Sequence, residues 1–202
     1  RGTPAVTAQT LVSTLPHRFA APAARRLAIK FLLSAAPVEG AANAGAMLEA
    51  RILALAGMAA WDDALALMDF VPAQSRTPML VRARVTGLLA KGRLDAACGE
   101  ARAAEDGDAT WAKLQILCQF ASGQNSAVTV SLGLLREQGF DDKVFLWATD
   151  IAQGNTGAPP PADLARAAAN GAIDPVTLAL LRQAYNAAAV PPGPARLAGD
   201  ER

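Results

Sequence analysis

The chain has 202 residues, of which 19 are basic and 18 acidic, so its formal net charge is +1. This balance lacks the concentrated positive charge of a nucleic-acid-binding surface, and we expect no nucleic-acid partner. Alanine makes up about a quarter of the residues and aromatic side chains only 5%, which favours helices over strands and predicts an all-α protein.

The N-terminal region predicts a tail followed by broken helices. Residues 1–9, RGTPAVTAQ, are small and polar, and we expect them to be a disordered tail. The stretch PAARRLAIKFLLSAA then predicts a helix with Pro22 in its first turn, where a missing N–H is tolerated. Its apolar stripe at helical spacing contains Leu27, Ala28, Phe31 and Leu32.

No segment of the sequence predicts a transmembrane helix. The best candidate, LAIKFLLSAAP, is interrupted by Lys30 and Pro37 and is shorter than a membrane span. The chain begins at Arg1, and a signal peptide or membrane tether before Arg1 is compatible with the sequence.

Residues 44–153 predict short helices joined by tight turns. AMLEARILALAG is followed by AWDDALALMDFV, PMLVRARVTGLLAKG by RLDAACGEARAAE, and TWAKLQILCQFASG by NSAVTVSLGLLREQG. The first helix of each pair ends in or near glycine, which accepts the left-handed conformation of a helix C-terminus. We therefore expect three helical hairpins, followed by a further helix over DDKVFLWATDIAQG.

The hairpins repeat along the sequence. The second copy follows the first at an offset of 33 residues, and Gly123 follows Gly92 at an offset of 31. The matched pairs are Ala50 with Ala83, Arg51 with Arg84, Leu55 with Leu88, Trp61 with Leu94, Asp62 with Asp95, and Ala64 with Ala97. Residues 45–138 thus resemble tetratricopeptide repeats, although Asn125 and Val128 replace the large apolar residue and the alanine in the third copy.

This resemblance implies a right-handed α-solenoid of stacked helix pairs, with extra helices at both ends. We expect the array to cover residues 10–157 and a C-terminal helical pair, packed on or linked to it, to cover 158–189. Asp174 is expected to cap the last helix, with Pro175 at its first position. Residues 190–202 are expected to be a disordered tail.

The two cysteines are expected to lie at the same level along two neighbouring helices. Cys98 and Cys118 are equidistant from Asp108, which falls in the turn between two helices that we expect to be antiparallel. They are therefore either small core residues with free thiols or a disulfide. A bridge would place the protein in an oxidising compartment.

The sequence offers little for catalysis or metal binding. His17 is the only histidine and is expected at the surface, while Glu39 stands alone as a candidate general acid. The pairs Asp62–Asp63 and Asp141–Asp142 begin helices, where capping and the helix dipole explain them. We expect no enzyme activity, no metal and no cofactor.

The expected function is binding of a peptide or helix from a partner protein in a concave groove of the array. Such a chain would be a scaffold or adaptor of a bacterial complex, and a periplasmic or envelope location is favoured over the cytoplasm. The alternative is an accessory superhelical domain of an envelope enzyme such as a lytic transglycosylase. Candidate partner-binding residues are Trp61, Trp111, Trp147, Arg51 and Arg84, although packing between helices also explains the tryptophans.

Overall fold

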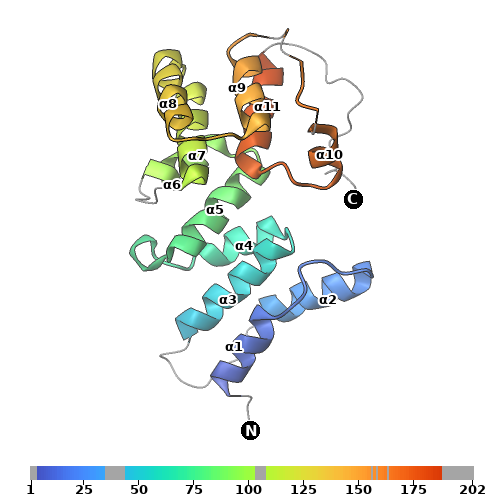
Figure 1. Ribbon diagram of the computed structural model, residues 1–202. Helices are drawn as coiled ribbons and strands as arrows, with labels where there is room; N and C mark the ends of the chain where they lie inside the picture. Colours follow the sequence, from blue (N-terminus) through green and yellow to red (C-terminus); the bar gives the residue numbers. More distant parts are fainter. Residues whose placement is uncertain are drawn as a thin grey trace. The chain divides into compact units, whose positions relative to one another are not determined.

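The computed structural model describes residues 4–34, 44–102, 108–155, 157, 159–162 and 164–187. Over these residues the chain forms eleven α-helices and one short 3-10 helix, and no strand occurs among them (Figure 1). The predicted all-α fold is therefore confirmed.

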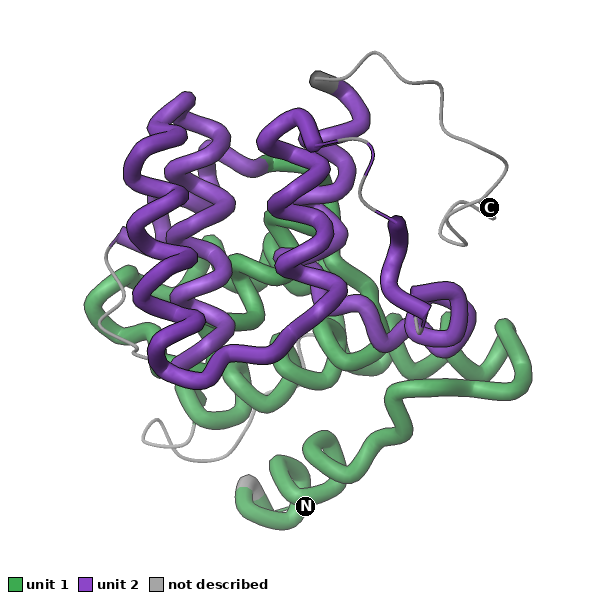
Figure 2. The backbone as a smooth tube through the Cα atoms, turned by 45° about the horizontal axis from the view of Figure 1, so that its top comes forward, with its two compact units in different colours: residues 1–93 green, residues 94–202 purple. Residues whose placement is uncertain are grey.

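The helices belong to two compact units, which Figure 2 colours separately. Unit 1 covers Arg1–Arg93 and unit 2 covers Leu94–Arg202. The α-helices of unit 1 are α1 (Ala5–Ser13), α2 (Pro22–Leu33), α3 (Ala44–Gly57), α4 (Trp61–Met68) and α5 (Pro78–Ala90), with the 3-10 helix Ala73–Ser75 before α5. Those of unit 2 are α6 (Leu94–Arg102), α7 (Ala109–Ala121), α8 (Asn125–Glu137), α9 (Lys143–Ala152), α10 (Leu164–Ala169) and α11 (Pro175–Ala187).

In unit 1, α3 is the central helix. It packs against α1, α2, α4 and α5, and α4 also packs against α5. One continuous apolar cluster fills the space between the first four helices, which removes its side chains from water. Its buried members are Val12, Leu32, Met47, Ala50, Ala54, Leu55, Met58, Ala60 and Ala64.

In unit 2, α7 is the central helix. It packs against α6, α8 and α11, and α11 also lies along α9. The hairpin of α7 and α8 is visible in Figure 1 as two helices side by side. Leu114, Ile116 and Leu117 of α7 are fully buried, so this helix contributes apolar side chains on more than one side.

Three helix ends share one backbone arrangement. Ala59, Gly92 and Gly123, which follow α3, α5 and α7, all have positive φ, at 54°, 69° and 71°. In each case the next residue donates its N–H to a carbonyl five residues back, which satisfies a helix end. The expected glycine caps are present at Gly92 and Gly123, and they recur after α8, α9 and α10 at Gly139, Gly154 and Gly171.

At the end of α3 the left-handed residue is Ala59 instead of the expected Gly57. Gly57 remains helical, and its missing side chain makes room for His17. A Cβ atom on Gly57 would lie only 2.6 Å from Cδ2 of the His17 ring. The glycine thus serves close packing between α3 and the segment that links α1 to α2.

The N-terminal region differs from the sequence prediction in two ways. Residues 5–9 are not a tail, because α1 begins at Ala5. In α2 the buried side chain is Leu32, whereas Leu27 and Phe31 of the predicted apolar stripe are exposed. Apolar residues occur all round this helix, so their spacing alone could not select the buried face.

Two of the three predicted hairpins, α3–α4 and α7–α8, have their helices in contact, and each lies within one unit. The boundary between the units falls between α5 and α6, inside the range 10–157. In the C-terminal region α11 packs against α9 and α7, so its main neighbour is α9 instead of the preceding α10. The predicted tail over 190–202 and the candidate general acid Glu39 lie outside the described residues.

Candidate functional site

A groove with a volume of about 600 Å³ lies along α6 and α7 in unit 2. Its apolar lining consists of Cys98, Ala101, Trp111, Ala112 and Cys118. Its polar lining consists of Arg102, Asp108, Gln115, Gln119, Ser122 and Gln124. A groove with an apolar wall and several amide or hydroxyl groups is suited to a ligand that is itself partly polar.

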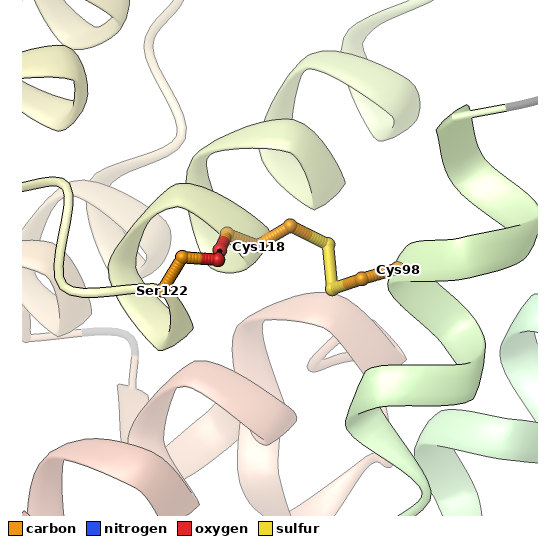
Figure 3. Close-up of a disulfide and its surroundings, with 3 residues drawn as sticks. All are labelled: Cys98, Cys118 and Ser122. Carbon is orange, nitrogen blue, oxygen red and sulfur yellow. Dashed lines mark hydrogen bonds between the residues drawn. A yellow bond between two sulfur atoms is a disulfide. The ribbon is translucent and has the colours of Figure 1, made fainter.

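A disulfide between Cys98 and Cys118 joins the two helices of this groove (Figure 3). The two Cα atoms are 5.6 Å apart, within the range that a bridge requires. The sequence left open whether the two cysteines are free thiols or a disulfide, and the structure contains the disulfide. Cys98 is buried and Cys118 is half-buried, and both line the groove.

Hydrogen bonds fix several of the polar groups around the groove. Asp108 accepts from the main-chain N–H groups of Thr110 and Trp111, at 2.9 and 3.1 Å, and so caps the N-terminus of α7. Ser122 donates to the carbonyl oxygen of Cys118 at 2.8 Å (Figure 3). The carbonyl oxygen of the Gln119 side chain accepts from Ser131 of α8 at 3.1 Å, which orients its amide nitrogen.

A partly buried ion cluster joins α7 to the starts of α9 and α11. Nζ of Lys113 donates to Asp174 at 2.8 Å and also to Asp142. Asp142 caps α9 through the N–H of Phe145, and Asp174 accepts from the first turn of α11. Each carboxylate therefore stabilises a helix N-terminus and a lysine at the same time.

Burial and pairing act in opposite directions on the charges of this cluster. Burial opposes the charge on Lys113, but hydrogen bonds to Asp142 and Asp174 and their negative charges raise the pKa of Lys113 above its ordinary value of 10.5. Burial likewise opposes ionisation of Asp174, but hydrogen bonds from Lys113 and Thr177 and the lysine charge lower its pKa below 3.8. An aromatic contact agrees with a charged ammonium group on Lys113, since its Nζ lies 5.3 Å from the centre of the Phe145 ring.

The structure distributes the tryptophans predicted to bind a partner over both units. Trp61 begins α4 and lies against Gly87 of α5, where a Cβ atom would be 3.0 Å from Cε3 of the indole. Trp111 is buried at the start of α7 and lines the groove. Trp147 is half-buried in the middle of α9. Only Trp111 therefore belongs to the groove.

Both predicted arginines make contacts inside unit 1. Arg51 donates to the carbonyl oxygen of Ser34 at 2.9 Å. Arg84 forms an ion pair with Asp69 at 2.9 Å.

His17 is exposed, as expected. Of the paired acids, Asp62 and Asp63 lie in the first turn of α4 and Asp142 is the cap of α9.

Lys113 and the glutamines of the groove were not predicted from the sequence. The signal for Lys113 is that α7 is apolar on several sides, so a lysine within it requires acidic partners. From the sequence alone, Asp142 and Asp174 are predicted only to stabilise the starts of their helices. No comparable signal exists for Gln115 and Gln119, since glutamine is common on exposed helix faces.

Comparison of the chain with protein-family models, curated proteins and solved structures finds no significant match in any of the three. Among the described residues, no three His, Cys, Asp or Glu side chains are grouped so that they could hold a metal ion. None of the described helices is long and apolar enough to cross a membrane.

Proposed function

We propose that the protein is a non-enzymatic interaction module that binds an extended segment of a partner protein in the groove along α6 and α7. The groove itself is the observation that carries this proposal. Its glutamine side chains can donate to and accept from a peptide main chain, and Trp111 and the alanines provide apolar contact. The disulfide holds the two walls together before binding, which reduces the entropy lost on association.

The wider proposal is an adaptor built from helical hairpins of the tetratricopeptide type, stacked as a solenoid. The hairpins α3–α4 and α7–α8 support it, as do the equivalent helix ends at Ala59, Gly92 and Gly123. The disulfide supports a periplasmic or other envelope location, because such bridges persist in oxidising compartments.

The experiment is selection of unstructured peptides from a phage-displayed library on the immobilised chain. The variant Ala112→Phe fills the groove, and Ser126→Phe adds the same side chain to an exposed position of α8. We expect the selected peptides to lose at least about tenfold in affinity for Ala112→Phe and to bind Ser126→Phe normally. Selected peptides that bind both variants equally would show that the groove is not the binding site.

A further inference from the structure

Helix α2 presents large apolar side chains to solvent. Leu27 is 70% exposed and Phe31 58%, and they lie one helical turn apart. Ala28, Ile29 and Leu32 occupy the opposite face, where they pack in the core of unit 1. The outward apolar pair is therefore not needed to attach α2 to its own unit.

The same outward face is basic. Arg26 and Lys30 are exposed and also lie one turn apart, in the row next to Leu27 and Phe31. Residues 4–34 contain four basic residues and no acidic one, whereas the whole chain has 19 basic and 18 acidic residues. Arg25 is directed elsewhere, since its guanidinium donates to the carbonyl oxygen of Met58. Two positive charges, on Arg26 and Lys30, thus lie beside the exposed apolar pair.

We propose that this face of α2 docks on an anionic lipid surface. Leu27 and Phe31 would enter the boundary between headgroups and acyl chains, while Arg26 and Lys30 would reach the negative headgroups with their long side chains. The charge of residues 4–34 is complementary to such a surface, where each lysine or arginine adds to the attraction. The apolar pair projects outward from a helix, which suits insertion into lipid better than reception of a protein side chain. The proposal concerns unit 1 and is independent of the groove in unit 2.

The test is sedimentation of the full chain with lipid vesicles. We expect binding to phosphatidylcholine vesicles that contain about 30% of the anionic lipid phosphatidylglycerol, and weak binding to phosphatidylcholine alone. The double substitution Leu27→Ser and Phe31→Ser should lower the partition coefficient at least about tenfold. Raising NaCl from about 0.05 to about 0.5 M should weaken binding to a similar extent.

A matched control is available on α8. Val130 and Leu134 are 63% and 54% exposed and also lie one turn apart, but they belong to unit 2. The double substitution Val130→Ser and Leu134→Ser should leave vesicle binding unchanged, and far-ultraviolet circular dichroism verifies the helicity of each variant. Failure of the chain to bind anionic vesicles, or equal binding by the α2 and α8 variants, would overturn the proposal. Preferential binding to soluble polyglutamate with no binding to vesicles would also overturn it, because it would indicate an acidic protein partner.

Discussion

Nζ of Lys113 lies 2.8 Å from Oδ2 of Asp174, although 61 residues separate them in the chain. The lysine also pairs with Asp142, so one side chain of α7 holds the starts of two later helices. Replacing Lys113 by Met keeps most of its volume but leaves two partly buried carboxylates facing each other. We expect a loss of about 2 kcal/mol in the free energy of unfolding, measured by guanidinium titration at neutral pH. Lys143→Met, at an exposed position of α9, is the control and should change stability by less than about 0.5 kcal/mol.

The ion cluster also predicts how stability depends on pH. The pKa of Asp174 is lowered, so its contribution is present above its ordinary value of 3.8 and is lost as pH falls through the folded-state pKa. The pKa of Lys113 is raised, so its contribution is complete below 10.5 and is lost as pH rises through the folded-state pKa. Thermal unfolding of the wild type should therefore show losses at both ends of the pH range. An equally steep profile for Lys113→Met would contradict this assignment.

The disulfide is expected to stabilise unit 2 because it restricts the unfolded chain. A bridge between residues 20 positions apart should contribute about 3 kcal/mol. The double variant Cys98→Ser and Cys118→Ser should lose this amount in denaturant unfolding, and dithiothreitol should lower the stability of the wild type but not that of the variant. Equal sensitivity of both proteins to the reductant would argue against the bridge.

Ala59 is the one described residue other than glycine with a positive φ, and this conformation is unfavourable for a side chain that has a Cβ atom. Ala59→Gly should therefore stabilise the protein by about 1 kcal/mol. The reciprocal change Gly92→Ala, at the equivalent end of α5, should destabilise it by a similar amount. Shifts in the midpoint of denaturant unfolding measure both effects, and the same sign for the two variants would refute the equivalence of these helix ends.

The contact of His17 with Gly57 can be measured by a double-mutant cycle. In the wild type, Gly57→Ala should be destabilising because the added methyl group lies 2.6–2.9 Å from three atoms of the His17 ring. In a His17→Ala background the same change should stabilise by about 1 kcal/mol, as expected when alanine replaces a helical glycine. Gly133→Ala, where nothing lies within 4 Å of the new Cβ atom, should be stabilising in both backgrounds. A coupling free energy near zero would rule out the contact.

Local rules of the sequence predicted the helix ends and caps well. Gly92 and Gly123 adopt the left-handed conformation, and Asp142 and Asp174 accept hydrogen bonds from the first turns of their helices. These features depend on neighbouring residues only, so a single sequence contains the necessary information.

Features that depend on distant residues were less predictable. The partnership of Lys113 with Asp174 requires α11 to return to α7, which no local pattern specifies. The exposed face of α2 could not be chosen because Leu27, Phe31 and Leu32 are all apolar, and only contact with α3 distinguishes them. The groove likewise depends on the approach of α6 to α7, for which the cysteine spacing was the only local indication.

The bridge between Cys98 and Cys118 also makes the intervening main chain part of a covalent ring. A protease that cuts one peptide bond inside this ring leaves both pieces in the same molecule. Mass spectrometry would then find a single species, heavier than the intact chain by one water molecule, until a reductant releases two fragments. Proteolysis of this segment would consequently escape detection on a gel run without reductant.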